Sequence, residues 1–453
     1  MKQPYSFFES LSTGQRVNSS NNVIIKEIFI DSRKNVQNGL FIPIVGERFD
    51  GHEFLLDAVK NGACAAFWQQ DKEVPKELPD DFLLFYVKDT LEALQQLAKK
   101  YLQHVKPIVL AVTGSNGKTT TKDILAGVLE QRFNVFKTQG NYNNHIGLPL
   151  TILAMDEACE ALILEMGMSG FGEISFLSQL ASPDLAIITN IGESHLEQLK
   201  SREGIAKAKM EIVDGLKRNG TVIIDGDEPL LKLRLNKNVL TCGYGNENKY
   251  QITEVTGNEN GLYFIINNNE RFFLPIIGKH NVKNAVYAIA AAQQMNLSFD
   301  EIYKGLSSLV MTNMRLEKLK GKQGALLIND AYNASPTSMK AAVEAVKFLE
   351  DYKEKVLVLG DMYELGSDEE RLHRSVADSI ESPITNVIAV GKKGRWIGEA
   401  VIDRDNNNIP ISFYTTKEEA QSKVESLLSP NTVVLFKASR GLKLETLIEA
   451  LVD

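Results

Sequence analysis

Cysteine is scarce in this sequence, and no two cysteines stand close together. The chain has three in 453 residues, Cys64, Cys159 and Cys242, and each lies in an apolar or turn context without the short spacing of a metal site. A secreted disulfide scaffold needs a denser set of paired cysteines. We therefore expect reduced thiols and a cytoplasmic protein.

A long apolar run and an excess of positive charge are also missing. No stretch of about 18 apolar residues occurs, and the first residues lack the apolar core of a secretion signal, so no membrane span is expected. The 50 basic residues are outnumbered by 58 acidic ones, which gives a formal net charge of −8. Domains that bind nucleic acid usually carry a basic face, so we expect no nucleic-acid partner.

The length and the order of apolar patterns predict an α/β protein of three domains. A chain of 453 residues exceeds what one hydrophobic core usually serves. Strand-like runs alternate with helical patterns, which is typical of doubly wound, mostly parallel sheets. We predict a small α/β domain at 1–105, a central domain with a mostly parallel sheet at 106–312, and a Rossmann-like C-terminal domain at 313–453.

The most informative motif is a glycine-bearing turn between a predicted strand and a predicted helix. The apolar run 108–112 leads into TGSNGKTT at 113–120, and apolar residues then recur at helical spacing. A helix N-terminus offers unpaired N–H groups and a partial positive charge, which together bind phosphate. The loop has two residues, not the usual four, between its first glycine and the Gly-Lys pair. A plain tight connection is the alternative, but the adjoining Lys-Thr favours nucleotide triphosphate binding.

Within this loop, two side chains have distinct predicted tasks. The Lys118 ammonium can reach the terminal phosphates, and the Thr119 hydroxyl can bind Mg²⁺. The full set of candidate phosphate-loop residues is Thr113, Gly114, Ser115, Asn116, Gly117, Lys118, Thr119 and Thr120.

Further candidate metal ligands follow two other strands of the central unit. Glu165 comes directly after the apolar run 161–164, and His195 comes shortly after 185–189. The carboxyl ends of parallel strands meet at one sheet edge, so both side chains are candidates for a Mg²⁺ site beside Thr119. Each has an ordinary alternative, because strand-end acids form ion pairs and a lone histidine is more often structural. Imidazole is an unusual Mg²⁺ ligand, so His195 would serve one of two ions.

Lys209 interrupts the apolar face of a helix predicted at about 202–217. It lies between Ile205 and Ile212, which fall on one face at helical spacing. Its side chain can snorkel to solvent, which is the ordinary behaviour of such a lysine. Alternatively, a desolvated lysine loses its proton more readily and can react with CO₂. Carbamylation would make the side chain acidic and able to bind metal.

Two other groups of polar residues also have two interpretations each. Arg33, Arg48 and His52 follow apolar strands of the first unit, where they can grip an anion or act as ordinary charged turn residues. Asn281 and Asn284 stand in the first turns of a predicted helix. They can cap that helix or offer amide groups to a base.

Taken together, the motifs resemble those of the Mur ligase family, the ATP-dependent amide-bond ligases of bacterial cell-wall precursor synthesis. The resemblance covers nearly the whole chain. DSRK at 31–34 and GERFDGH at 46–52 resemble its UDP-binding first domain. The remaining motifs are TGSNGKTTTKD at 113–123, EMG at 165–167, TNIGESHLE at 189–197, AKAKMEI at 206–212, GKHNVKNA at 278–285, MRLE at 314–317, INDAYNASPTSM at 328–339, LGDMYELG at 359–366 and KASRG at 437–441.

The resemblance implies a ligase that joins D-alanyl-D-alanine to UDP-N-acetylmuramoyl-tripeptide through an acyl phosphate, with ATP and Mg²⁺ as cofactors. It implies catalytic roles for Lys118, His195, Lys209 and Arg315. It places Thr119, Glu165, His195 and a carbamylated Lys209 at two Mg²⁺ ions. It adds ATP contacts at Asn281, Asn284 (adenine), Arg315 and Asp330 (ribose). It assigns the other substrates to Ser32, Arg33, Gly46, Arg48, Phe49, Asn144, Tyr332 and Asn333.

Several alternatives stay open at this point. The nearest is a ligase of the same family that adds a single amino acid to UDP-N-acetylmuramoyl-dipeptide, although the DNPR-like motif of that branch is missing. The others are a folylpolyglutamate synthetase, a nucleotide-binding module without turnover, and a simple kinase. The sequence leaves open whether the third residue of the tripeptide is lysine or diaminopimelate. We expect a monomer.

Overall fold

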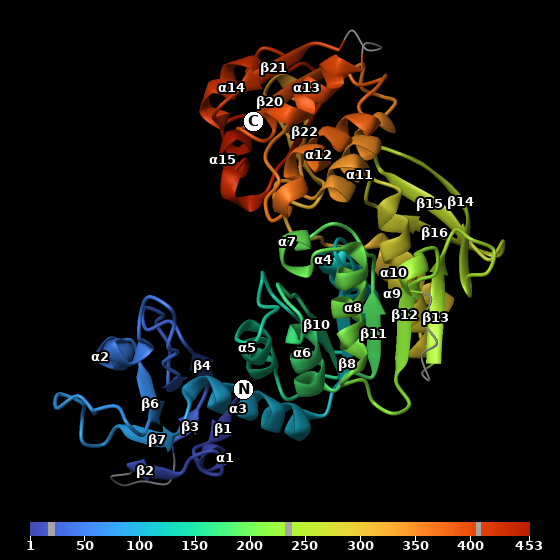
Figure 1. Ribbon diagram of the computed structural model, residues 1–453. Coiled ribbons are helices and arrows are strands. Elements are labelled where there is room, and N and C mark those ends of the chain that lie inside the picture. The colour runs from blue at the N-terminus through green and yellow to red at the C-terminus, as the bar shows by residue number, and fades with distance from the viewer. Residues whose placement is uncertain (17–22, 232–237, 405–408) are drawn as a thin grey trace.

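The computed structural model describes residues 1–16, 23–231, 238–404 and 409–453. Within them, three α/β units follow one another along the chain, from the blue through the green and yellow to the red part of Figure 1. Their sheets have five, nine and six strands. The predicted α/β class, with mostly parallel sheets in several units, is confirmed.

The first unit is a small sheet with strand order β2-β7-β6-β5-β4, in which only β2 is antiparallel to its neighbour. A separate antiparallel pair joins β1 to β3. Its strands are β1 (Gln3–Pro4), β2 (Gly14–Arg16), β3 (Ile24–Ile25), β4 (Glu27–Phe29), β5 (Gly39–Phe41), β6 (Ala63–Gln69) and β7 (Leu83–Val87). Its helices are α1 (Ser6–Glu9), α2 (Leu55–Lys60) and α3 (Thr90–Val105).

The central unit has the strand order β16-β15-β14-β13-β12-β11-β8-β10-β9. All neighbours from β9 through β8 to β14 in this order pair in parallel, and β14, β15 and β16 form an antiparallel extension. The strands are β8 (Ile108–Thr113), β9 (Val135–Lys137), β10 (Ala161–Glu165), β11 (Leu185–Ile188), β12 (Thr221–Asp225), β13 (Asn238–Gly243), β14 (Tyr250–Asn258), β15 (Gly261–Ile266) and β16 (Glu270–Leu274). The helices are α4 (Lys118–Leu129), α5 (Gly147–Ala154), α6 (Glu173–Ala181), α7 (Leu196–Leu199), α8 (Arg202–Met210), α9 (His280–Gln294) and α10 (Phe299–Ser307).

The C-terminal unit has the order β17-β18-β22-β19-β20-β21, with only β17 antiparallel. Its strands are β17 (Glu317–Lys320), β18 (Leu326–Asn329), β19 (Glu354–Leu359), β20 (Asn386–Val390), β21 (Ile411–Tyr414) and β22 (Thr432–Lys437). Its helices are α11 (Pro336–Lys347), α12 (Glu369–Arg374), α13 (Arg395–Asp403), α14 (Lys417–Glu425) and α15 (Glu445–Glu449). The central strands of this sheet are buried, which explains their almost continuous apolar sequences.

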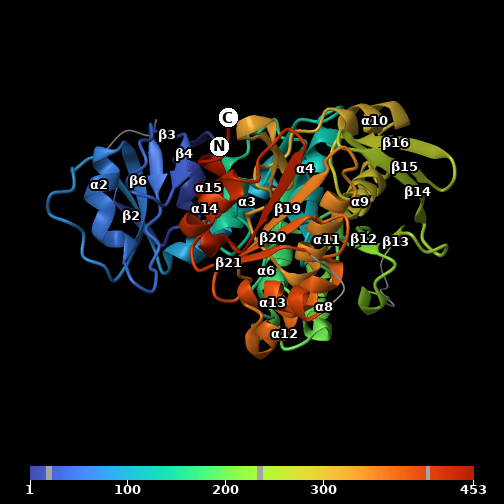
Figure 2. The same ribbon diagram turned by 90° about the horizontal axis from the view of Figure 1, so that it is seen from above.

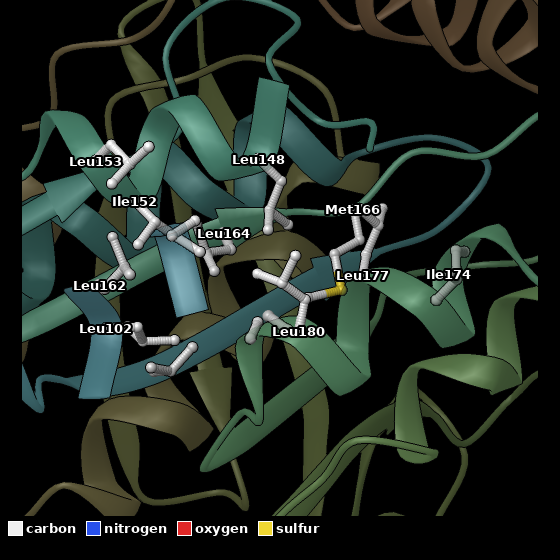
Figure 3. Close-up of a cluster of buried hydrophobic side chains, with 14 of the residues drawn as sticks. Leu102, Leu148, Ile152, Leu153, Leu162, Leu164, Met166, Ile174, Leu177 and Leu180 are labelled. Carbon is white, nitrogen blue, oxygen red and sulfur yellow. The ribbon is translucent and has the colours of Figure 1, made fainter. Parts of the chain in front are cut away.

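Helix α3 joins the first two units through a shared hydrophobic core. Its apolar residues belong to one buried cluster with residues of α5, β10 and α6, and Figure 3 draws Leu102, Leu162 and Leu180 among the members of this cluster. The Tyr101 hydroxyl donates a hydrogen bond to the Met155 carbonyl at 3.0 Å. Because one buried cluster includes residues of both units, separating them would expose apolar surface to water.

The C-terminal unit meets the central unit mainly through polar contacts. Ser335 Oγ donates to Asn116 Oδ1 at 3.1 Å, and Thr337 Oγ1 donates to Glu193 Oε2 at 2.7 Å. In Figure 2 the red C-terminal unit lies over the central unit, and the blue first unit lies to one side. In the described part of the chain, no helix combines the length and the apolar composition that crossing a membrane requires.

Candidate active site

The phosphate loop connects β8 to α4 in a conformation that requires its two glycines. Gly114 and Gly117 have φ values of 151° and 80°, in the left-handed region that favours glycine. A Cβ on Gly117 would lie 2.6 Å from Asn284 Oδ1. Asn190 Oδ1 accepts a hydrogen bond from the Asn116 amide at 2.9 Å. The loop is therefore held at the start of α4 by Asn190, which follows β11, and Asn284 of α9 leaves no room for a side chain at Gly117.

Lys118, the first residue of α4, lies folded back on its own loop. Its Nζ donates to the Gly114 carbonyl at 2.8 Å. Burial lowers the pKa of the Lys118 ammonium, and the nearby Arg315 charge lowers it further, whereas Glu165 opposes both. A neutral carbonyl is a weaker partner for an ammonium than a phosphate oxygen. The side chain can therefore exchange this contact for a bound phosphate.

Glu165 lies at the end of β10, directly opposite the phosphate loop. Its Oε2 accepts from the Thr119 hydroxyl at 2.9 Å, and its Oε1 accepts from Asn143 Nδ2 at 3.0 Å. Glu165 and Thr119 are both buried. Parallel pairing of β8 with β10 brings the two together, as the sheet-edge argument predicts. Asn143 was not among the predicted site residues, because its loop has no periodic signal that fixes its direction.

Arg315 reaches the loop from the start of the C-terminal unit. Its guanidinium lies 4.3 Å from the Tyr332 ring centroid, and an NH2 atom lies 3.4 Å from Thr119 Oγ1. Its Nε has no hydrogen-bond partner within the described residues. A guanidinium that is stacked on an aromatic ring and only partly hydrogen-bonded can still accept an anionic partner.

Asp330, at the end of β18, lies in a buried ion pair that sequence reasoning missed. Lys437 Nζ, at the end of β22, donates to Asp330 Oδ2 at 2.6 Å and to the Asn333 carbonyl at 3.1 Å. Burial lowers the pKa of the Lys437 ammonium, and Asp330 opposes that effect. The KASRG stretch was recognised only as a motif, whereas the adjacency of β18 and β22 shows what its lysine contacts.

Asn281 and Asn284 lie in the first turns of α9 but do not cap it. The Asn281 amide donates to the Ile277 carbonyl at 2.8 Å, and the Asn284 amide donates to Asn281 Oδ1 at 3.0 Å. Lys279 occupies the N-cap position without a side-chain cap. The capping interpretation is therefore wrong, and both residues instead line the cavity at the phosphate loop.

His195 and Lys209 lie in very different surroundings. His195 precedes α7 with a φ of 62°, and its Nδ1 lies 2.9 Å from Glu364 Oε2 of the C-terminal unit. Lys209 is 2% exposed on α8, so it does not snorkel to solvent. Burial lowers the pKa of Lys209 well below its ordinary value, and the Lys118 charge adds to this. The ammonium has no hydrogen-bond or ion-pair partner within the described residues.

Helix α8 is shorter than predicted. It ends at Met210 and continues only as a 3₁₀ turn over Glu211–Val213, whereas the periodicity predicted a helix to about 217. The Glu211 carboxylate explains the change, because it accepts from the amides of Gly172 and Ser175. This tertiary contact fixes the end of the helix at a point that its own sequence does not mark.

Two of the three anion-binding candidates of the first unit already have protein partners. Arg33 is exposed and paired with Asp31, with 2.7 Å between Arg33 NH2 and Asp31 Oδ2. His52 is buried against Trp68, and its Nδ1 lies 2.6 Å from Asp50 Oδ1. His52 therefore has the structural role. The remaining candidates surround this turn, with Ser32 buried and Gly46, Arg48 and Phe49 exposed.

A cavity of about 380 Å³ joins most of the predicted residues between the central and C-terminal units. It is lined by Ser115, Asn116, Gly117, Lys118, Thr119, Thr120, Asn144, Glu165, His195, Asn281, Asn284, Arg315, Asp330, Tyr332 and Asn333. Its lining does not include Thr113, Gly114, Lys209, Ser32, Arg33, Gly46, Arg48 or Phe49. Asn144 lines the cavity, but its side-chain oxygen Oδ1 accepts a hydrogen bond from the Gly147 amide at 2.8 Å at the start of α5.

Sequence patterns of known families match all three units. The Mur ligase middle domain matches residues 112–292, the glutamate ligase domain of Mur ligases matches 314–440, and the Mur ligase family catalytic domain matches 24–102. A UDP-N-acetylmuramoyl-tripeptide–D-alanyl-D-alanine ligase from Bacillus subtilis (strain 168) is 50% identical over 433 residues, which cover 95% of this chain and 94% of that protein.

Solved structures agree with these matches. The crystal structure of MurF from Acinetobacter baumannii superimposes with a TM-score of 0.87 and 30% identity, covering 100% of this chain and 99% of that one. The MurF ligase of Thermotoga maritima in complex with ADP gives a TM-score of 0.82 and 28% identity, covering 94% and 96% of the two chains. The similarity therefore extends over all three units.

Proposed function

The chain belongs to the Mur ligase family, and from that premise we propose that it joins D-alanyl-D-alanine to UDP-N-acetylmuramoyl-tripeptide in peptidoglycan precursor synthesis, with ATP as the energy source. The 50% identical relative from Bacillus subtilis carries this activity in its name. The MurF ligase of Thermotoga maritima was solved with ADP, which supports ATP use. The alternative of a ligase that adds a single amino acid has no comparable support.

The observation that carries the proposal is the convergence of cations on one cavity in an acidic protein. Lys118 and Arg315 reach it from different units, although the chain has a net charge of −8. A carboxylate that approaches a triphosphate meets strong electrostatic repulsion. Preorganised cations in a site that excludes water reduce this repulsion far more than exposed charges do. The crevice is thus suited to a reaction between an acid and ATP.

The residues present also fit Mg²⁺. The Thr119 hydroxyl and the Glu165 carboxylate meet at 2.9 Å at the mouth of the phosphate loop, as oxygen ligands for a hard cation. His195 lines the same cavity. Lys209 is buried without a hydrogen-bond or ion-pair partner in the described part of the chain. Carbamylation would convert its amine into an acidic group that can bind Mg²⁺. Bound Mg²⁺ would neutralise charge that develops on the phosphates.

The remaining roles are those that the family resemblance implies, and four of the residues concerned line the cavity. Asp330 would hold the ribose, and Asn284 would contact the adenine. Tyr332 and Asn333 would lie near the incoming dipeptide, since both line the cavity on the side of the C-terminal unit. The turn of the first unit around Ser32 and 46–52, with Phe49 70% exposed, would receive the UDP-linked substrate.

The proposed reaction proceeds in two steps. An oxygen of the terminal carboxylate of the tripeptide attacks the γ-phosphorus of ATP, so that the bond to ADP breaks and an acyl phosphate forms. The amine of D-alanyl-D-alanine then attacks the acyl carbon, loses a proton, and expels phosphate with the original carboxylate oxygen. Lys118 and Arg315 would stabilise the charge on the transferring phosphoryl group. Closure of the two units would exclude water, which would otherwise hydrolyse the acyl phosphate.

A paired-substrate assay tests the function. Phosphate release should require ATP, UDP-N-acetylmuramoyl-tripeptide and D-alanyl-D-alanine together, and tripeptides that end in lysine and in diaminopimelate should both be tried. Preference for a single amino acid with the dipeptide substrate would instead identify the other branch of the family. Stable phosphorylated product without an amine would indicate a kinase, and ATP binding without turnover would indicate a binding module.

Replacing Glu165 should change the metal requirement. Glu165→Ala removes an oxygen ligand from the proposed site, so the Mg²⁺ concentration for half-maximal activity should rise by about tenfold or more. Glu173→Ala is the matched control, because Glu173 lines the same cavity but its carboxylate accepts from the Ser169 and Gly170 amides. An equal Mg²⁺ requirement in both variants would remove Glu165 from the metal site. Chelation by EDTA should stop turnover in all of them.

Localisation and assembly are part of the proposal. Cys64, Cys159 and Cys242 are all unpaired, which suits a reducing compartment such as the cytoplasm. The expected monomer is part of the proposal and would be checked by the mass of the protein in solution.

A further inference from the structure

The chain crosses from the central to the C-terminal unit over a short segment, 312–316. Leu309 and Met311 pack against the core of the central unit, and Leu316 is buried in the core of the C-terminal unit. Arg315, the proposed phosphate-binding cation, lies at the far end of this crossing. Its position therefore depends on where the segment leaves the central unit and on the path that the backbone follows.

Three alternate backbone amides of the crossing donate to three carboxylates. The Thr312 amide donates to Asp123 Oδ2 at 2.9 Å, and the Leu316 amide donates to Asp330 Oδ1 at 3.2 Å. The amide between them, that of Met314, donates to Glu317 Oε2 at 2.9 Å. One carboxylate thus belongs to the central unit and two belong to the C-terminal unit, so the segment is fixed at both ends.

The backbone of the crossing is also strained. Met314 and Leu316 have φ values of 61° and 50°, in the left-handed region that residues with a Cβ rarely adopt. Such conformations persist only where the surrounding contacts over-determine them, and they cluster at functional sites. The amide–carboxylate contacts hold the backbone in this conformation on either side of Arg315.

Asp123 is the anchor on the central unit. Its side chain is 0% exposed on α4, and it lies one helical turn after Thr119. The same helix therefore holds the segment at Thr312 through Asp123 and meets Arg315 at Thr119, where the distance is 3.4 Å. Asp123 does not line the cavity. Its second oxygen, Oδ1, accepts from Lys137 Nζ at 2.7 Å.

From this arrangement we propose that Asp123 is a positioning residue: it clamps the Thr312 amide so that Arg315 reaches the phosphate loop. The inference rests on the proposed function, because that function gives Arg315 a phosphate of ATP as its partner. It goes further by assigning a role in the reaction to a buried carboxylate that does not line the cavity. The clamp links the phosphate-loop helix directly to the junction between the two units.

Asp123→Asn tests the clamp with little change in shape. Both oxygens of Asp123 face donors, whereas an amide offers one oxygen and one NH₂ group. The charged Lys137 is the stronger partner for the amide oxygen, so the NH₂ group would face the Thr312 N–H and the clamp would be lost. We expect kcat to fall by about 10- to 100-fold, since a displacement of about 1 Å can cost 10²-fold in rate.

Lys137→Met is the matched control. It removes the other hydrogen-bond partner of the same buried carboxylate, while the Thr312 contact and the ion pair of Asp123 Oδ1 with Lys122 Nζ at 3.8 Å stay in place. Both variants should lower the melting temperature, but only Asp123→Asn should lower kcat. Hydrogen exchange of the peptide that covers 308–316 should accelerate in Asp123→Asn and stay unchanged in Lys137→Met. A merely structural role for Asp123 would make the two variants alike in both measurements.

A double variant separates action through Arg315 from any independent effect. In an Arg315→Ala background, Asp123→Asn should lower kcat no further, because the group that it positions is gone. An additive loss would overturn the proposal, as would equal kcat values in the two single variants or unchanged hydrogen exchange in Asp123→Asn. Failure of the wild-type protein to release phosphate in the paired-substrate assay would refute the proposed function instead, and the hydrogen-exchange comparison would still report on the clamp.

Discussion

Lys118→Ala is expected to lower kcat by about 10³-fold, because the variant lacks a cation aimed at the phosphates in the transition state. Lys118 begins α4, and its ammonium has only the Gly114 carbonyl of its own loop as a hydrogen-bond partner within the described residues. Removal of the side chain therefore deprives the protein of no distant structural contact. The loss should appear in the rate of phosphate release at saturating substrates.

The fold of this variant can be checked by its melting temperature, which should stay close to that of the wild-type protein. Apart from its hydrogen bond to the Gly114 carbonyl, the lysine side chain takes no part in the contacts that shape the loop, such as the one with Asn190. Turnover at more than a tenth of the wild-type rate would show that Lys118 does not serve the phosphates.

Lys209→Ala is expected to lower kcat by at least about 100-fold if a carbamylated lysine holds the second metal ion. Short carboxylic acids such as formate or acetate should restore part of the activity, because a small carboxylate can occupy the space that the lysine leaves. The side chain is 2% exposed, so the space that it leaves is enclosed. The Lys209 ammonium has no hydrogen-bond partner in the described chain, so no protein group replaces the missing charge. Activity should be measured with and without added acid at constant ionic strength.

Lys207→Ala is the control for this experiment. Lys207 lies on the same helix but is exposed, with its Nζ 5.7 Å from the Phe171 ring centroid. Its replacement should leave activity unchanged and insensitive to added acid. Wild-type rates for Lys209→Ala without any additive would refute the carbamate.

Local patterns were sufficient to predict the core of the site. The strand, the glycine-bearing turn and the helix at 108–129 follow from apolar periodicity and from the conformational demands of glycine. The position of Glu165 at a strand end predicted its approach to Thr119, and parallel pairing of β10 with β8 realises it. The spacing of Lys209 from Ile205 and Ile212 left both snorkelling and burial open, and the structure shows burial.

Contacts between distant parts of the chain could not be predicted in this way. Asn143 lies in a loop, Lys437 ends β22 and Asp123 lies on α4, and no local pattern tells which distant group each side chain meets. Their partners, Glu165, Asp330 and the Thr312 amide, are brought to them only by the sheet order and by the crossing between units. His52 shows the converse. A turn histidine beside two arginines indicated an anion site, but Trp68 and Asp50 hold its ring inside the first unit.

The central claim is that the cationic crevice lets a carboxylate attack ATP, and isotope transfer tests it most directly. The terminal carboxylate of the tripeptide would be labelled with a heavy oxygen isotope, and the phosphate released during ligation to D-alanyl-D-alanine would be analysed by mass spectrometry. An acyl phosphate requires that one carboxylate oxygen leave with the phosphate, so we predict one labelled oxygen per released phosphate. Release of unlabelled phosphate together with the ligated product would contradict the account.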